Sequence, residues 1–167
     1  MDEKLKTKLS NLKLLALDVD GVLTDGKLFY SENGLELKAF DVKDGLGLKQ
    51  LIDAGIDIAI ITSRNSIAVE KRAEELGIRQ VRQGVKNKLD ALIKVCRELK
   101  IEISECAYMG DDLPDLEAMA CAGISLTVAD AATEIIDLAD WVSSRPGGQG
   151  AVREICEIIL RSLIFIR

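Results

Sequence analysis

Two aspartates, Asp18 and Asp20, stand one residue apart directly after residues 12–17, an apolar run short enough to be a buried parallel strand. Side chains alternate along an extended strand, so both carboxylates can point into the same mouth where this strand ends. Like charges resist joint ionisation, and the pair is costly unless a divalent cation or a proton is held there. Gly21 and Gly26 follow and free the backbone for a sharp turn. The stretch therefore predicts a carboxylate site for a metal ion or a proton.

Further polar side chains stand where other predicted strands end. Thr62 and Ser63 follow a second apolar run, Asp111 and Asp112 follow a third, and a loop between them reaches Lys88. In a doubly wound parallel sheet, the carboxyl ends of the strands open onto one crevice. We therefore expect these five residues to lie around the same crevice as the paired aspartates.

This set of side chains is suited to phosphoryl transfer. The Asp18 carboxylate can attack phosphorus and form an aspartyl-phosphate, which splits one difficult displacement into two easier ones. Asp20 is placed to protonate the leaving alkoxide and then to activate water. Asp18 and Asp111, with a backbone carbonyl, provide the hard oxygen ligands that Mg²⁺ prefers. Thr62 and Lys88 can donate to the equatorial phosphoryl oxygens.

Each of these residues also has a purely structural interpretation. Asp20 can form a turn before Gly21, and Asp112 can cap a helix. Thr62 and Ser63 can cap the next helix, and Lys88 can be ordinary solvated surface. The residues occur together, in order, and each at a predicted strand end, and this consistency favours the functional interpretation.

Composition narrows the class of protein. The 167 residues carry a net charge of -6, which argues against a nucleic-acid partner because phosphates need a basic surface. An acidic protein that meets a phosphorylated substrate needs a metal ion locally. The chain contains no histidine, which excludes Ser-His-Asp and Cys-His catalysis and His-ligated zinc. A receiver domain is a rival class, but there the adjacent acids stand on the first strand, whereas here they come late. A catalytically idle scaffold is a second rival.

The cysteines and the N-terminus predict a cytoplasmic protein. No C-x-x-C spacing occurs, and each cysteine lies in an apolar pattern, which is typical of buried free thiols in a reducing compartment. These cysteines are Cys96, Cys106, Cys121 and Cys156. The first six residues have no apolar core, so we expect no signal peptide, and no apolar run is long enough to cross a bilayer. We expect no membrane partner.

Strand-like and helix-like patterns alternate along the whole chain and predict a single domain over residues 1–167. Apolar runs typical of strands occupy residues 12–17, 56–61, 78–82, 106–109, 123–128 and 141–143. Helical periodicity or helix-ending signals occupy residues 44–54, 66–76, 88–99, 113–122, 131–138 and 151–163. Residues 27–40 read as a β-hairpin. We predict an α/β fold of three layers, Rossmann-like, with a mostly parallel central sheet.

The spacing of the polar residues resembles the four motifs of the haloacid dehalogenase superfamily: Asp18-x-Asp20, Thr62, Lys88 and Gly110-Asp111-Asp112. The resemblance is closer still to the 3-deoxy-D-manno-octulosonate 8-phosphate phosphatase family. It covers nearly the whole chain from about residue 12 to residue 160. Its further motifs are Asp18 to Gly26, Lys43-Asp44-Gly45, Gly84 to Leu89, Gly110 to Asp115 and Gly147 to Glu154.

This resemblance implies a role for each site residue. Asp18 is expected to be the nucleophile and Asp20 the general acid/base, and Mg²⁺ is expected on Asp18, the Asp20 carbonyl and Asp111. Phosphate binding is expected from Thr62, Ser63 and Lys88, and support from Asp112 and Asp115. Ser63 departs from the family pattern, because glycine is more usual at its position.

The chain has no room for the cap domain that most of the superfamily uses to exclude water. Only the hairpin and one helix lie between Asp20 and Thr62. The family instead forms a homotetramer in which hairpins associate and neighbouring subunits complete the sites. The sequence is compatible, because an isolated hairpin with five large apolar side chains needs another surface. The segment after Leu163 is short, whereas family tails can reach a neighbouring site, so the resemblance leaves open whether it acts as a lid.

Arg64 and Arg72 follow Thr62 and are candidates for binding a sugar-acid carboxylate, because guanidinium pairs bidentately with planar anions. For Arg72, a weak surface pair with Glu75 is an equal alternative. Related nonulosonate 9-phosphate phosphatases tend to have an acidic residue where this chain has Arg64. The resemblance therefore implies the octulosonate 8-phosphate as substrate, in lipopolysaccharide precursor synthesis, with a nonulosonate 9-phosphate as the alternative.

Overall fold

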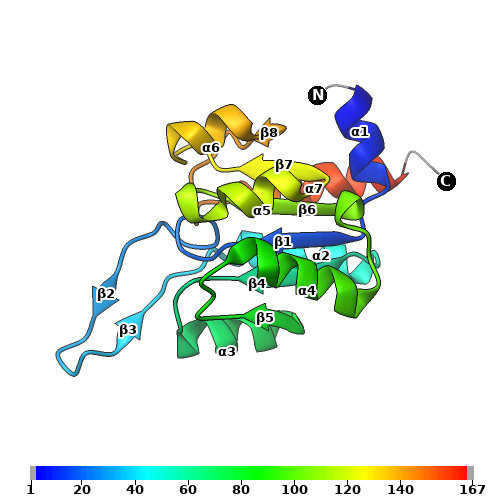
Figure 1. The fold of residues 1–167 in the computed structure, drawn as a ribbon. Helices are drawn as coiled ribbons and strands as arrows, with labels where there is room; N and C mark the ends of the chain where they lie inside the picture. The colour runs from blue at the N-terminus through cyan, green and yellow to red at the C-terminus, as the bar shows by residue number, and fades with distance from the viewer. Residues whose placement is uncertain (1–2, 165–167) are drawn as a thin grey trace.

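Six parallel strands form the central sheet of the computed structural model, which describes residues 3–164 (Figure 1). The strand order is β5-β4-β1-β6-β7-β8, so that β1 lies in the middle. Leu17, the last residue of β1, is level with Ile60 of β4 and Met109 of β6. The carboxyl ends of these three strands therefore open together, as the motif spacing predicts. The strand bounds are β1 Leu14–Leu17, β4 Asp57–Ile61, β5 Gln80–Arg82, β6 Cys106–Gly110, β7 Ile124–Thr127 and β8 Trp141–Val142.

Helices cover both faces of this sheet and make the three predicted layers (Figure 1). Leu15 and Leu17 of β1 face a core shared with α1, α2, α3 and α7, whereas Leu14 and Ala16 face a core shared with α4, α5 and α6. This alternation explains why the strand is apolar at every position. The helix bounds are α1 Glu3–Ser10, α2 Val42–Asp53, α3 Ile67–Leu76, α4 Lys88–Leu99, α5 Leu116–Cys121, α6 Thr133–Leu138 and α7 Ala151–Ile164.

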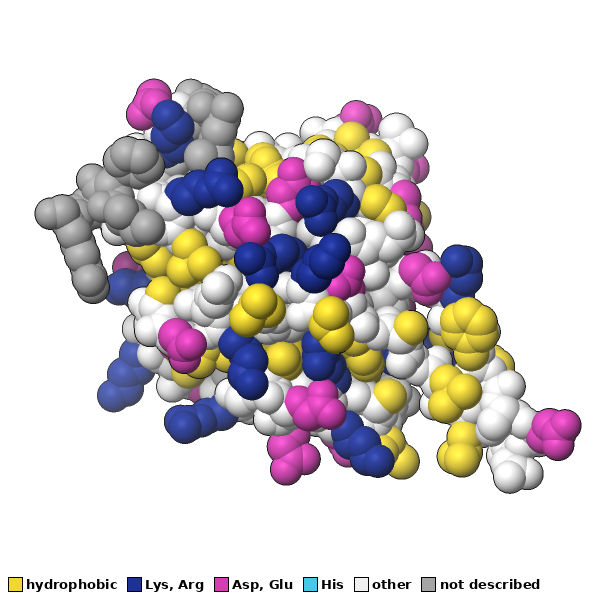
Figure 2. Space-filling view, turned by 180° about the vertical axis from the view of Figure 1, so that it is seen from behind, with side chains coloured by type: hydrophobic (Ala, Val, Ile, Leu, Met, Phe, Trp, Pro, Cys, Tyr) yellow, Lys and Arg dark blue, Asp and Glu magenta, His cyan; other side chains and the backbone are white. Residues whose placement is uncertain are grey.

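The predicted hairpin is present and projects away from the body of the protein (Figure 1). Its strands β2 (Phe29–Tyr30) and β3 (Glu36–Leu37) pair antiparallel, with Phe29 opposite Leu37. Five large apolar side chains of the hairpin are between 44% and 63% exposed, and Figure 2 shows such side chains along it. These residues are Leu28, Phe29, Tyr30, Leu35 and Leu37.

The fold class is confirmed, and three details differ from the sequence-based expectation. Helix α1 was not predicted. The helix expected from residue 113 starts as a 3₁₀ turn, Leu113–Asp115, before α5. Cys96, Cys106 and Cys156 are buried, but Cys121, the last residue of α5, is exposed. The buried-thiol prediction is wrong for that residue.

Among residues 3–164, no helix is both long enough and apolar enough to cross a membrane. Residues 1–2 and 165–167 lie outside the described part of the chain. They include the start of the segment examined for a signal peptide and most of the short tail after Leu163.

Candidate active site

Asp18 lies directly beyond β1 and is buried. Its Oδ1 accepts a hydrogen bond from the Val19 N–H at 2.7 Å, and its Oδ2 lies 2.7 Å from Lys88 Nζ. Lys88 is the first residue of α4 and is also buried, so its interpretation as solvated surface is wrong. The end of the central strand and the start of α4 are thus joined by an ion pair.

Asp115 holds this lysine from the other side. Its Oδ1 lies 2.7 Å from Lys88 Nζ and accepts a hydrogen bond from the Tyr108 hydroxyl at 2.9 Å. Its Oδ2 accepts from the N–H groups of Asp111 and Asp112, at 3.3 and 3.4 Å. Both carboxylate oxygens of this fully buried residue are therefore occupied by protein donors. Such contacts suit the supporting role that the resemblance implies.

Three carboxylates could together hold a metal ion: oxygens of Asp18, Asp111 and Asp115 lie within 4.8 Å of one another. Each oxygen of Asp115 already has two protein donors, whereas each oxygen of Asp18 has one, so Asp18 and Asp111 are the candidate side-chain ligands. Carboxylate oxygens are the donors that Mg²⁺ prefers, so the donor set fits this ion. Gly21 has φ +89° and packs so closely on Asp111 that a Cβ at Gly21 would overlap its carboxylate.

Burial and mutual repulsion raise the pKa values of the two candidate ligands, Asp18 and Asp111. Burial, with the negative charge of Asp115, raises the pKa of Asp18 to about 6, although Lys88 opposes the shift. Burial, with the charges of Asp18 and Asp115, raises the pKa of Asp111 to about 7. Ionised carboxylates at such a site indicate a need for positive charge beyond that of Lys88.

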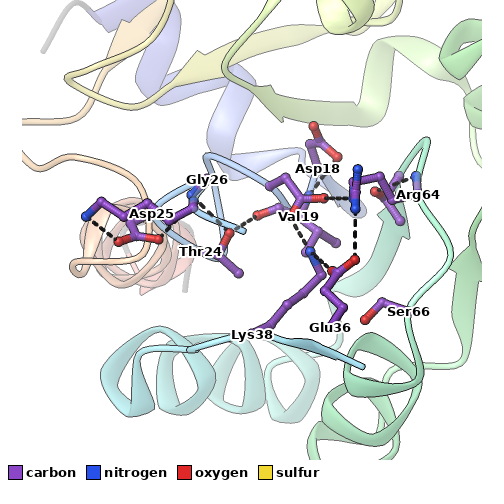
Figure 3. A network of polar contacts seen from close by, with 12 residues as sticks. Asp18, Val19, Thr24, Asp25, Gly26, Glu36, Lys38, Arg64 and Ser66 are labelled. Carbon is purple, nitrogen blue, oxygen red and sulfur yellow. Dashed lines mark hydrogen bonds and ion pairs between the residues drawn. The ribbon is translucent and has the colours of Figure 1, made fainter. Parts of the chain in front are cut away.

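Asp20 lies in the turn after Asp18 and joins a network of charges with Glu36, Lys38 and Arg64, all three of which are labelled in Figure 3. Its Oδ1 contacts Lys38 Nζ, and its Oδ2 lies 3.9 Å from Arg64 Nε. Glu36 joins both cations, with Oε1 2.7 Å from Lys38 Nζ and Oε2 2.9 Å from Arg64 Nη2. Arg64 Nη2 also donates to the Tyr30 hydroxyl at 3.2 Å. The predicted acid/base and the predicted carboxylate-binding arginine therefore lie side by side.

The remaining predicted residues are placed as follows. Thr62 is buried directly after β4, and its Oγ1 accepts from the Arg64 N–H at 3.4 Å. Ser63 is exposed beside it. Asp112 Oδ1 accepts from the Leu113 N–H at 2.8 Å and caps the 3₁₀ turn, which is its structural interpretation.

Arg72 lies in α3 and does not join the Asp20 network. Its Nη1 is 3.2 Å from Glu75 Oε2, and its Nη2 donates to the Asp41 carbonyl at 3.3 Å. Its guanidinium also lies over the Phe40 ring. The alternative pair with Glu75 is thus present, together with the contacts to Asp41 and Phe40, and a substrate role for Arg72 stays a prediction.

Sequence reasoning missed Lys38, Glu36 and Tyr108. Glu36 and Lys38 stand two residues apart in a strand-like run, so they share one face and are opposite in charge. Tyr108 is a hydroxyl-bearing residue within a buried strand, where its O–H needs an acceptor. Both patterns are visible in the sequence, but neither shows which partner the side chain meets.

The sheet with β1 at its centre, and the carboxylates and lysine at its carboxyl edge, define a haloacid dehalogenase-like hydrolase. The family model of that description matches residues 41–123. Known 3-deoxy-D-manno-octulosonate 8-phosphate phosphatases are similar over most of their length. The one from Salmonella typhi is 47% identical over 154 residues, which are 92% of this chain and 82% of that protein. The one from Escherichia coli K12 is 46% identical over 92% of this chain and 81% of that protein.

Solved structures of phosphatases of the same name are also similar to this chain. The phosphatase of this name from Moraxella catarrhalis, in complex with magnesium, phosphate and 3-deoxy-D-manno-octulosonate, has a TM-score of 0.95 and 45% identity. The match covers 99% of this chain and 98% of that one. The cobalt-bound phosphatase from Haemophilus influenzae has a TM-score of 0.91 and 42% identity, over 93% of this chain and 91% of that one. The chain belongs to the 3-deoxy-D-manno-octulosonate 8-phosphate phosphatase family.

Proposed function

We propose that this protein is a Mg²⁺-dependent phosphatase that hydrolyses 3-deoxy-D-manno-octulosonate 8-phosphate to the free sugar acid and phosphate. This reaction serves lipopolysaccharide precursor synthesis. The observation that carries the proposal is the buried Asp18, held by Lys88 beside Asp111 and two residues before Asp20. The 47% identity to a phosphatase of that name supports the substrate. A nonulosonate 9-phosphate is the alternative substrate, and Arg64 in place of an acidic residue disfavours it.

The mechanism uses the two aspartates in turn. Asp18 attacks phosphorus and forms an aspartyl-phosphate, while the alkoxide of the sugar acid leaves with a proton from Asp20. Asp20 then takes a proton from the water that attacks the phosphorus of this intermediate. The attack releases inorganic phosphate and restores Asp18.

The other residues hold charge and position. Mg²⁺, bound by Asp18, Asp111 and the Asp20 carbonyl, neutralises charge on the phosphoryl oxygens. Lys88 orients Asp18 and donates to the transferred group, with Asp115 fixing the lysine. We assign phosphate donors to Thr62 and Ser63, and support of the Asp111 loop to Asp112.

We assign binding of the sugar-acid carboxylate to Arg64, and Arg72 is a second candidate for this role. Arg64 is near Asp20 and partly exposed, so an incoming carboxylate can reach its guanidinium. Arg72 does not join this network within one chain.

We further propose that the protein is a homotetramer that works in the cytoplasm. The exposed apolar hairpin supports the assembly, because a lone surface of this kind favours self-association. The four free cysteines support the reducing compartment.

The test is phosphate release with Mg²⁺ across a panel of substrates. The panel holds the octulosonate 8-phosphate, nonulosonate 9-phosphates, hexose phosphates and p-nitrophenyl phosphate. We expect kcat/KM for the octulosonate to exceed the others by about 100-fold. Asp18→Asn is the control: it should abolish turnover and keep the fold, since the other carboxylate near Asp111, that of Asp115, has protein donors on both of its oxygens. Equal rates across the panel would contradict the substrate, and normal rates in Asp18→Asn would contradict the mechanism.

A further inference from the structure

Lys38 is a buried cation at the base of an otherwise exposed hairpin. Its side chain is only 2% exposed, although the residue as a whole is half-buried and Leu37 before it is exposed. Lysine is seldom buried unless it is paired, because removing its charge from water is costly. Hydrogen bonds to Asp20 and Glu36 overcome the effect of burial and raise the pKa of Lys38, so it remains charged. The desolvation of this ammonium group is unfavourable, which suggests that its contacts serve the site.

The two carboxylate oxygens of Asp20 are in different situations. Oδ1 contacts Lys38 Nζ directly. Oδ2 is 3.9 Å from Arg64 Nε, which is beyond hydrogen-bond distance. One oxygen is therefore anchored, and the other is left to exchange a proton with a ligand.

Glu36 offsets part of the positive charge that Lys38 presents to Asp20. Its Oε1 lies 2.7 Å from Lys38 Nζ, so the ammonium is shared between two carboxylates. With Arg64 on the other Glu36 oxygen, the network holds two cations and two anions and is formally neutral. Lys38 can thus hold the orientation of Asp20 without delivering an uncompensated positive charge to it.

We propose that Lys38 is a positioning residue that anchors Asp20 Oδ1 and leaves Oδ2 to carry the proton, so that the hairpin orients the general acid/base. This inference rests on the proposed function, because it takes Asp20 as the acid/base. The bonds are those of the mechanism above: Oδ2 gives its proton to the leaving oxygen and then accepts one from the attacking water. Lys38 loses no proton in either step.

Leaving-group dependence tests this role. The value of kcat/KM reports only the steps up to aspartyl-phosphate formation, in which a sugar alkoxide needs a proton and p-nitrophenolate leaves without one. For Lys38→Met, we expect kcat/KM to fall about 10- to 100-fold with the sugar acid phosphate and to stay within about 3-fold with p-nitrophenyl phosphate. Lys38→Arg, which keeps the charge, should recover part of the loss. Lys27→Met, the same change at an exposed hairpin lysine, is the matched control and should leave both values unchanged.

Double variants separate positioning from direct substrate binding. If Lys38 acts through Asp20, Asp20→Asn with Lys38→Met should be no slower than Asp20→Asn alone. Losses that multiply would overturn the proposal, because they would mean that Lys38 binds the substrate itself. Equal losses on both substrates in Lys38→Met, or none, would also overturn it. If Lys38→Met does not fold, the neutral pair Glu36→Gln with Lys38→Met replaces it and carries the same expectation.

Different measurements would reject the proposed phosphatase function. An inactive wild-type enzyme would reject the phosphatase. An Asp20→Asn variant that loses as much with p-nitrophenyl phosphate as with the sugar acid phosphate would reject Asp20 as the proton donor. In both cases the role of Lys38 is overturned as well, but through the wild-type or Asp20→Asn measurement and not through Lys38→Met.

Discussion

Asp18 and Asp111 have pKa values of about 6 and about 7, and this makes the metal-free protein sensitive to pH. In the unfolded chain both groups return to a pKa near 3.8. Between those values the folded state binds more protons, so the free energy of unfolding contributed by these groups falls as the pH rises. Mg²⁺ binding needs both carboxylates ionised and is therefore expected to strengthen over the same range.

We predict that Mg²⁺ raises the thermal midpoint strongly at about pH 8 and little at about pH 5. Thermal unfolding with Mg²⁺ or with a chelator, at several pH values, measures this difference. Asp111→Asn is the control, because it removes one ligand and should flatten the dependence. A stabilisation by Mg²⁺ that is the same at both pH values would contradict the assigned ligands.

Gly21 and Gly55 offer a matched pair of substitutions. Both have φ +89°, so alanine at either position should cost about 1–2 kcal/mol of backbone strain. Only at Gly21 does the new methyl group overlap Asp111, whereas nothing lies within 4 Å at Gly55. We predict that Gly21→Ala weakens Mg²⁺ activation of turnover at least about 10-fold and that Gly55→Ala leaves it unchanged. A Mg²⁺ titration of activity checks this, and equal behaviour of the two variants would refute the packing argument.

At the scale of elements, α2 packs against α7, and a buried carboxylate adds a hydrogen bond between the two helices. Asp44, in the first turn of α2, is 1% exposed, and its Oδ1 accepts from the Arg153 N–H at 2.7 Å. It therefore satisfies a free N–H at the start of α7, as an N-cap would. Burial raises the pKa of Asp44, although the Arg153 N–H opposes the shift. The motif Lys43-Asp44-Gly45 had no assigned role from the sequence, and this contact provides one.

Removal of this hydrogen bond should destabilise the protein. We predict that Asp44→Ala lowers the free energy of unfolding by about 1–3 kcal/mol, because the Arg153 N–H loses its acceptor. Denaturant titration measures the change. Asp53→Ala, at the exposed end of the same helix, should stay within about 0.5 kcal/mol of the wild type. A similar small effect at Asp44 would show that water replaces the bond at no cost.

Elements with strong local signals were predictable, and contacts between distant segments were not. Helix α4 has the predicted bounds, since Asn87 accepts from the Asp90 N–H at its start and an apolar stripe runs along it. Helix α1 was missed because its two buried leucines, Leu5 and Leu9, are stabilised by packing on α7, which no local pattern reveals.

The same distinction holds within the site. The carboxylates at strand ends were found from spacing, because the parallel sheet brings strand ends together. The contact of Lys38 with Asp20 depends on how the hairpin folds back over 18 residues, which spacing does not specify. The contact of Arg72 with the Phe40 ring was likewise not visible from spacing, and its substrate role stays a prediction.

At the scale of the whole molecule, the proposed assembly would depend on the exposed apolar side chains of the hairpin. We predict a tetramer in sedimentation and a smaller species after Phe29→Ser with Leu37→Ser, the pair that faces across the two strands. Activity per subunit should fall when assembly is lost, because neighbours are expected to complete each site. Ile93→Ser, a change of the same kind on α4, is the control. A fully active monomer would contradict the shared-site proposal.

The edges of the central sheet are short, since β5 has three residues and β8 has two. Unpaired edge groups are the usual template for adding a foreign strand, and short edges provide few of them. A further strand, as added in fibril growth, would therefore find few unpaired backbone groups at the edges of this sheet. Exposed apolar surface is instead concentrated on a protruding hairpin, and contacts between such hairpins can close on themselves. Rising concentration should then change the number of subunits in a finite assembly without starting a fibre.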